Sequence, residues 1–249
     1  MLGALLTTIL WATPTRAGDE YNGSNFPIPE HTAVYEVLRR GSSIGKLHVR
    51  LERDGDRFHY STESEATSTL ARMLRASADE AAEFQFTSDG LKPSRYEQST
   101  RFPGRNRFWE ADFDWEASAA RGEDHNGELD VELTESTLDP LTLRLALALA
   151  MAREDLAADE YSFDVLERNE VETQSFKNRG YFNINLPAGC LGAWQMERIR
   201  EGSDRVFNSW HAPDFHFMPV RILQERDGRQ DLDIRLIETS LLEAPEQCD

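Results

Sequence analysis

The sequence has few basic residues and no basic run. It contains 27 lysines and arginines against 45 aspartates and glutamates, which gives a formal net charge of −18 at pH 7. Only three of the basic residues are lysines, namely Lys46, Lys92 and Lys177. Nucleic acids and anionic membrane surfaces are bound by concentrated basic patches. We therefore expect no nucleic-acid partner, and we interpret the acidity as a contribution to solubility.

Motifs for cofactor and metal chemistry are also missing. The sequence has no glycine-rich loop of the kind that binds phosphate and no dinucleotide-binding fingerprint. Six histidines are present, but none belongs to an HExxH pattern and no cysteine pair accompanies them. These absences predict a protein that is not an enzyme and has no cofactor and no metal. An unrecognised hydrolase is the alternative.

Cysteine is scarce, with Cys190 and Cys248 as the two cysteines of the chain. Their separation excludes a CxxC redox motif. In an exported protein the two thiols can be oxidised to a disulfide, which would tie the C-terminal tail to the loop near Pro187. Two unrelated free thiols are the alternative.

Residues 1–17 have the pattern of a secretory signal peptide. Residues 2–12 form a short apolar run, and the small-residue pattern that ends at Ala17 suits cleavage before Gly18. One feature departs from the pattern, because no basic residue precedes the apolar run. We expect an exported protein that is cleaved near Ala17. A cytoplasmic protein with an apolar N-terminal end is the alternative.

The remaining chain is expected to form one folded unit. Residues 18–31 are rich in asparagine, glycine and proline, which predicts a leader or linker. Residues 32–242 are expected to form a single β-rich domain, and residues 243–249 a loose tail. Within the domain, short runs alternate apolar and polar residues and are separated by turn signals, which predicts about a dozen antiparallel strands.

One long apolar segment, residues 138–153, interrupts the strand pattern. Its spacers are mostly alanine and Thr142 is its only β-branched residue, which favours a helix. Asp139 followed by Pro140 fits a helix cap and a first helical position. The helix is apolar nearly all round, so we expect a sheet to enclose it. A transmembrane span needs roughly 20 apolar residues and disfavours a central Arg144, so none is expected in the mature chain.

These elements predict a mainly β fold, in which a curved antiparallel sheet or half-barrel is wrapped around one central apolar helix. By a strict count of elements the fold is α+β. Turn signals also predict a two-residue loop at residues 54–55 and a three-residue loop at residues 227–229. The facing pairs expected from these loops are Leu51 with Phe58, Ile222 with Ile234, and Val220 with Leu236.

Bulky aromatic residues are concentrated in the predicted strands, among them Trp109, Phe113, Trp194 and Trp210. Their ordinary role is to pack in the core against the apolar helix. Alternatively, a curved sheet collects them on its concave side as a groove for an acyl chain or an extended peptide. In that case Arg221 is the candidate that contacts the head group of the ligand. A structural salt bridge is the other interpretation of Arg221.

Several short motifs occur in a fixed order along the chain. They include Ala33-Val-Tyr-Glu-Val37, Ala111-Asp-Phe-Asp-Trp115, Leu186-Pro-Ala-Gly189 and, most specific, Trp210-His-Ala-Pro-Asp214 followed by Pro219-Val-Arg-Ile222. Over about residues 32–240 the chain resembles the proteobacterial family of exported proteins called domain of unknown function 3108. The resemblance implies a periplasmic, mainly antiparallel β fold with no established catalytic residue. It does not support the disulfide, because members usually have no cysteine at the position of Cys190.

The leading functional interpretation is a non-enzymatic periplasmic protein. It would bind an apolar small molecule such as a lipid, or a segment of an envelope protein, in the half-barrel. A structural or assembly factor whose cavity is filled by its own helix is the alternative within the same fold.

Overall fold

The computed structural model describes residues 26–73, 76–102, 104–153, 158–200 and 202–241. The described residues contain a 14-stranded sheet, two α-helices and a 3-10 helix. The strands are β1 (His31–Arg39), β2 (Ser42–Asp54), β3 (Arg57–Ala66), β4 (Ser77–Thr87), β5 (Gly90–Phe102), β6 (Arg105–Asp114), β7 (Ala119–Asp124), β8 (Gly127–Glu132), β9 (Glu160–Glu167), β10 (Glu170–Leu186), β11 (Gly189–Ile199), β12 (Arg205–His211), β13 (Pro219–Arg226) and β14 (Arg229–Thr239). The helices are α1 (Thr69–Met73), α2 (Thr142–Arg153) and η2 (Pro213–Phe215).

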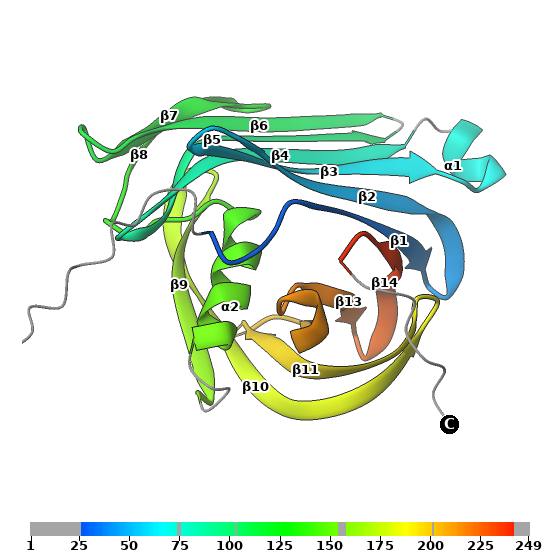
Figure 1. Ribbon diagram of the computed structural model, residues 1–249. Coiled ribbons are helices and arrows are strands. Elements are labelled where there is room, and N and C mark those ends of the chain that lie inside the picture. Colours follow the sequence, from blue (N-terminus) through cyan, green and yellow to red (C-terminus); the bar gives the residue numbers. More distant parts are fainter. Residues whose placement is uncertain (1–25, 74–75, 103, 154–157, 201, 242–249) are drawn as a thin grey trace, which may run out of the picture.

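Each strand pairs with its sequence neighbour in the antiparallel sense, except that β8 and β9 are separated and β1 pairs with β14. The two ends of the described chain therefore meet at the centre of the sheet, and β8 and β9 are its edges. Among the described strands no ladder joins these edges, so the sheet is open. Helix α2 connects them and lies inside the curve of the sheet (Figure 1). This architecture confirms the predicted curved antiparallel sheet around one apolar helix.

Helix α2 begins at Thr142, later in the chain than the predicted start at Leu138. The Asp139 carboxylate accepts hydrogen bonds from the backbone N–H groups of Leu141 at 2.7 Å and Thr142 at 2.9 Å, and so caps the helix as expected. Leu138 is extended instead and forms an isolated parallel bridge with Val165 of β9. The chain therefore contacts one edge of the sheet before it enters the helix.

The core lies between α2 and the concave face of the sheet. Leu141, Leu145 and Ala148 have no exposed surface, and the remaining leucines of the helix are also buried. On the N-terminal strands the rings of Phe58 and Phe84 stack with centroids 5.2 Å apart. Full burial of one leucine side chain contributes about 1.5–3 kcal/mol, so the helix is a major source of stability.

The β2–β3 hairpin differs from its predicted register. The loop consists of Gly55 and Asp56, and Leu51 faces Tyr60 and not Phe58. Gly55 has a φ of 60°, which is the left-handed conformation that a type II′ turn requires at its first loop position. The predicted register was wrong because it placed this glycine second in the loop. Leu51 keeps its predicted face, since an even shift of the partner does not change the side of the sheet.

The β13–β14 hairpin has the predicted pairing of Ile222 with Ile234, but a different loop. Asp227 and Gly228 form a two-residue loop, and their φ angles of 51° and 68° fit a type I′ turn. The predicted three-residue loop was wrong. The extra residue is Asp231, which lies in a register shift within β14.

Several predictions concern the chain ends. Residues 1–17 and 243–249, like residues 18–25 of the predicted leader, lie outside the described residues, so the domain boundaries stay predictions. None of the described helices has the length and apolar character needed to cross a bilayer. Cys190 is disulfide-bonded. Its predicted partner Cys248 lies outside the described residues, so that pairing also stays a prediction.

Candidate functional site

Two hollows lie on the concave face of the sheet. The first, which we call the apolar hollow, has a volume of about 310 Å³. Its large apolar lining residues are Val37, Ile44, Leu47, Phe102, Leu232 and Ile234. Arg39, Lys46, Glu65 and Arg101 also line it, and the lining includes residues of β1–β5 and β14 but none of α2. The helix therefore leaves this part of the concave face uncovered.

The second hollow, which we call the polar hollow, has a volume of about 210 Å³ and lies between α2 and strands β9–β13. Leu143 and Leu147 of α2 form part of its apolar wall. Its polar lining residues are Arg144, Glu167, Gln174, Arg198, Ser209 and His211. Ile222 of this hollow faces Ile234 of the apolar hollow across the β13–β14 ladder. The two hollows therefore begin one strand apart.

Arg144 of α2 lines the polar hollow and connects the helix to the N-terminal half of the sheet. Its Nη2 donates to Oε2 of Glu80 on β4 at 2.8 Å, and the two side chains are 29% and 18% exposed. Burial acts to lower the pKa of Arg144, but Glu80 and the neighbouring tyrosines outweigh this effect and raise it. Burial also raises the pKa of nearby Tyr60 to about 12. Arg144 is therefore charged and Tyr60 neutral at physiological pH.

Three polar side chains meet in the wall formed by β9, β10 and β11. Oε1 of Glu167 accepts hydrogen bonds from Nε2 of Gln174 at 2.6 Å and from Nη2 of Arg198 at 3.4 Å. Burial lowers the pKa of Arg198, and Glu167 opposes this shift. Oε1 of Gln174 and Nε of Arg198 are buried, and neither has a hydrogen-bond partner among the described residues. The wall thus holds one unpaired acceptor and one unpaired donor.

His211 is a buried, neutral imidazole at the side of the polar hollow. Its Nδ1 lies 2.7 Å from the backbone oxygen of Phe217, and its Nε2 lies 2.8 Å from Oγ of Ser209. Because a carbonyl oxygen only accepts, Nδ1 carries the proton and Nε2 accepts from the Ser209 hydroxyl. Burial lowers the pKa of His211 to about 4, against the hydrogen bond to Phe217. His211 adds no positive charge to the hollow at neutral pH.

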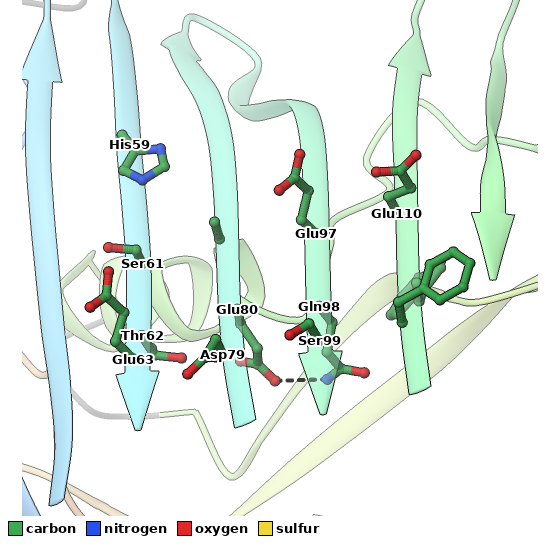
Figure 2. Close-up of a pocket in the computed structure, with 13 residues that line it drawn as sticks. His59, Ser61, Thr62, Glu63, Asp79, Glu80, Glu97, Gln98, Ser99 and Glu110 are labelled. Carbon is green, nitrogen blue, oxygen red and sulfur yellow. Dashed lines mark hydrogen bonds between the residues drawn. The ribbon is translucent and has the colours of Figure 1, made fainter. Parts of the chain in front are cut away.

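The convex face of β3–β6 carries an acidic groove of about 320 Å³ (Figure 2). Its lining includes Glu63, Glu97 and Glu110 together with Phe108, which is 43% exposed. Among the described residues, no group of three or more histidine, cysteine or carboxylate side chains is arranged to hold a metal ion. The groove is a charged surface with no metal-binding geometry.

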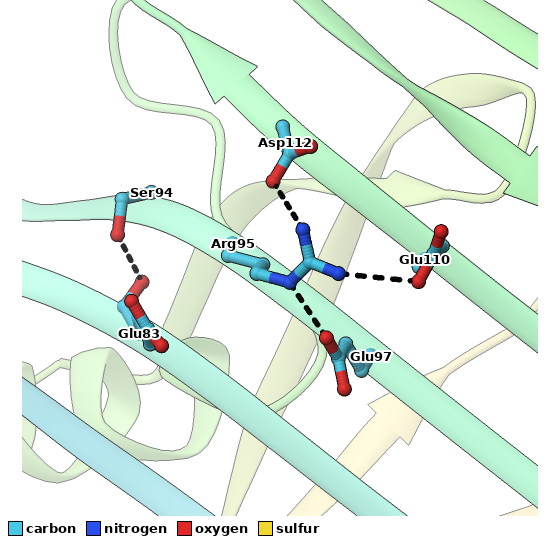
Figure 3. A network of polar contacts seen from close by, with 6 residues as sticks. All are labelled: Glu83, Ser94, Arg95, Glu97, Glu110 and Asp112. Atoms are coloured by element: carbon cyan, nitrogen blue, oxygen red, sulfur yellow. Dashed lines mark hydrogen bonds and ion pairs between the residues drawn. The ribbon is translucent and has the colours of Figure 1, made fainter.

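Arg95 organises the carboxylates beside this groove (Figure 3). It donates to Glu97 at 2.6 Å, to Asp112 at 2.9 Å and to Glu110 at 3.2 Å. The hydrogen bond to Glu97 is the main cause of the raised pKa of Arg95. These side chains are 37–66% exposed, so water and salt screen the network and each ion pair contributes at most about 1 kcal/mol.

The five residues predicted to bind a ligand do not meet at one site. Trp109 and Phe113 on β6 are core residues, 3% and 8% exposed, and the Trp109 ring lies 4.7 Å from that of Tyr96. The indole N–H of Trp109 is buried and has no hydrogen-bond partner among the described residues. Trp194 on β11 is half-buried and packs against Tyr181 with ring centroids 5.3 Å apart.

Trp210 and Arg221 face each other across β12 and β13. Their chain neighbours Ser209 and Ile222 line the polar hollow, so alternation places Trp210 and Arg221 on the convex face. The Arg221 guanidinium lies 4.9 Å from the Trp210 ring centre and donates to both carboxylate oxygens of buried Asp233, at 2.9 and 3.0 Å. Arg221 thus forms a structural salt bridge. A ligand-binding role for the five residues stays a prediction.

Sequence reasoning missed the polar residues of the concave face. Arg144 had a signal, because a charged residue at the centre of an apolar helix needs a buried partner. Gln174 and Arg198 had none, because polar residues at alternate strand positions usually face water.

Residues 41–45, Gly-Ser-Ser-Ile-Gly, have the spacing of a serine nucleophile motif. In hydrolases this serine lies in a sharp turn between a strand and a helix. Here Gly41 lies in the turn between two strands, β1 and β2, with a φ of 81°, and Ser43 pairs with Leu38. The spacing therefore gives no support to a hydrolase.

Comparison with known proteins gives a family and several structural likenesses, among them the two below. No curated protein matches the chain. A crystal structure of a beta-barrel-like protein of domain of unknown function DUF1849 from Brucella abortus has 9% identity and a TM-score of 0.48, over 84% of this chain and 96% of that chain. A protein with YMCC-like fold from Bacteroides fragilis has 11% identity and a TM-score of 0.31, over 86% and 98%. The family model described as protein of unknown function (DUF3108) matches residues 34–233, so the chain belongs to this family, as its motifs predicted.

Proposed function

We propose that the protein is an exported, non-enzymatic module that binds a single-chain amphipathic lipid on its concave face. The observation that carries this proposal is the apolar hollow of about 310 Å³, which lies at the lower end of the roughly 300–1,000 Å³ range of ligand sites. An apolar hollow of this size on a part of the concave face that α2 leaves uncovered favours a ligand over a scaffold whose cavity is filled by its own helix.

The neighbouring polar hollow supports a ligand with one polar end. Its apolar wall includes Leu143, Leu147 and Ile222, whereas Gln174 and Arg198 face it with hydrogen-bonding groups. A lipid has this same division between a chain and a head group. An entirely apolar ligand would use only the first hollow.

Export to the periplasm is part of the proposal. It is supported by the signal-like pattern of residues 1–17 and by the disulfide at Cys190, since disulfides persist in oxidising compartments. Mass measurement of protein from the periplasmic fraction tests it, and we expect a mature chain that begins at Gly18. Full-length protein found only in the cytoplasm would contradict export.

Lipid binding is tested by native mass spectrometry of periplasmic protein and by calorimetry with 1-monodecanoylglycerol. We expect co-purified lipid mass and saturable binding. Ile234→Trp should weaken binding at least tenfold by filling the apolar hollow. Val206→Trp is the matched control, because Val206 is 39% exposed on β12 and lines neither hollow.

Two results would overturn the proposal. A clean apo mass together with no binding of monodecanoylglycerol would favour the structural or assembly role. Turnover of ester or glycoside substrates that co-purifies with the folded protein would show that it is an enzyme.

A further inference from the structure

The polar hollow contains two buried polar atoms that the fold leaves without partners. Gln174 is 3% exposed, yet its Oε1 accepts no hydrogen bond from the described residues. Nε of Arg198 is also buried and donates to none of them. An unsatisfied buried polar atom is costly, and nearly all such atoms in native proteins have a partner. Gln174 and Arg198 both line the polar hollow, so a group bound there is the candidate partner for both atoms.

The orientation of Gln174 follows from the chemistry of its neighbour. Glu167 presents a carboxylate, which only accepts hydrogen bonds, and the Gln174 side chain lies 2.6 Å from it. The amide nitrogen must therefore face Glu167, which directs Oε1 away from it. Arg198 donates through Nη2 to the same Glu167 oxygen, which leaves Nε for another acceptor.

The two arginines that line the hollow are already paired with carboxylates. Arg144 pairs with Glu80 at 2.8 Å, and Arg198 pairs with Glu167 at 3.4 Å. His211 is neutral because its burial lowers its pKa, against the hydrogen bond to Phe217. Among the described residues that line this hollow, no positive charge is left unpaired for a carboxylate or a phosphate. A carboxylate would also place its oxygens against the Gln174 oxygen, which is repulsive.

We infer that the polar hollow selects a neutral head group that accepts a hydrogen bond from Arg198 and donates one to Gln174. A hydroxyl, as in the glycerol of a monoacylglycerol, provides both functions. A fatty-acid carboxylate or a simple ester provides only acceptors. This inference rests on the proposed function, because the acyl chain is assigned to the concave face.

The test compares three ligands of equal chain length by calorimetry at pH 7.5, namely 1-monodecanoylglycerol, decanoate and methyl decanoate. We expect the monoacylglycerol to bind at least about tenfold more tightly than the other two. Gln174→Met, which keeps the length of the side chain and removes its polar atoms, should reduce this preference to less than about threefold. Gln195→Met is the matched control, because Gln195 lies outside the hollow and bonds to Asn208.

The outcomes separate the inference from the proposed function. Equal binding of all three ligands, or tighter binding of decanoate, would overturn the head-group inference and leave lipid binding intact. Binding of none would overturn both. Should Gln174→Met unfold, Arg198→Lys replaces it, since lysine keeps the charge opposite Glu167 but has no Nε–H at that position. If a folded Gln174 or Arg198 variant keeps the full preference for the monoacylglycerol, these residues do not select the head group.

Discussion

The two sides of α2 face regions that are packed very differently. Where α2 covers the N-terminal strands, Leu145 of the helix and ring side chains of the sheet such as Phe84 and Tyr96 fill the space, and none of the three has exposed surface. The apolar hollow lies on the part of these strands that the helix does not cover. Over β9–β13 the same helix borders a hollow with polar groups in its wall. Apolar character is alike on both sides of the helix, so hydrophobicity does not cause the difference. One side of α2 serves stability, and the other borders the polar hollow.

The largest effect is expected at the ion pair that connects the two regions. Glu80→Leu leaves the Arg144 charge without a partner on the concave face, which should reduce the free energy of unfolding by about 3–5 kcal/mol. Urea denaturation measures this change. The double variant Glu80→Leu/Arg144→Leu should recover most of the loss, because no unpaired charge remains.

A fall in the unfolding free energy of less than about 1 kcal/mol for Glu80→Leu would contradict the difference in packing between the two sides of α2. It would mean that water in the polar hollow screens Arg144 well, and that the helix is not held to a dry N-terminal region.

A smaller effect is expected from the titration of His211 beside the polar hollow. Its pKa is about 4 in the folded protein, below the ordinary value of 6.5, so the unfolded chain binds more protons between these values. Stability therefore falls as the pH is lowered from about 6.5 to 4, by about 2–3 kcal/mol from this group. The measurement is the difference in unfolding free energy between wild type and His211→Gln across this range.

Wild type must be compared with His211→Gln because the titration of Asp139 changes stability with pH in the opposite direction. Burial raises its pKa to about 6, so this group loses stability as the pH rises from about 3.8 to 6. Its contribution cancels between wild type and variant. A difference that does not change with pH would show that the region around His211 is wet.

The smallest effect compares two leucines of α2 directly. Leu145 lines neither hollow, whereas Leu147 lines the polar one. Leucine to alanine in a core costs about 2–5 kcal/mol, and the cost grows with the cavity left behind. We expect Leu145→Ala to be more destabilising than Leu147→Ala by about 1–2 kcal/mol in urea unfolding. Equal losses would mean that both sides of the helix are packed alike.

The general architecture follows from patterns that are visible in the sequence. Alternation predicted the strands, and the alanine spacers and the Asp139 cap predicted the apolar helix, because these signals are local. Register was less predictable. A glycine at the first or second place in a loop shifts the pairing of a whole hairpin, as Gly55 does.

The candidate site was the least predictable part, because it depends on which strands face each other across the fold. Trp210 and Arg221 carry the most specific motif, yet alternation turns them to the convex face. Gln174 and Arg198 look like ordinary surface residues in the sequence. Alternation places them on the concave face, but no single strand shows which face of the sheet curves inward.

The ladder between β1 and β14 joins two sets of strands, β1–β8 and β9–β14, and within each set neighbouring strands are consecutive in the sequence. The carbonyl of Thr32 accepts a hydrogen bond from the N–H of Ser240 at 3.0 Å, so the first and the last described strands lie side by side along this ladder. Removal of β14 would therefore separate β1 from β13 in the middle of the sheet, whereas removal of an edge strand would only shorten the sheet. New ends opened ahead of α2, with the old ones linked, should give a circularly permuted chain that still folds. In the natural chain β1 pairs with β14, which lies far from it in the sequence. Such long-range pairing favours slow folding.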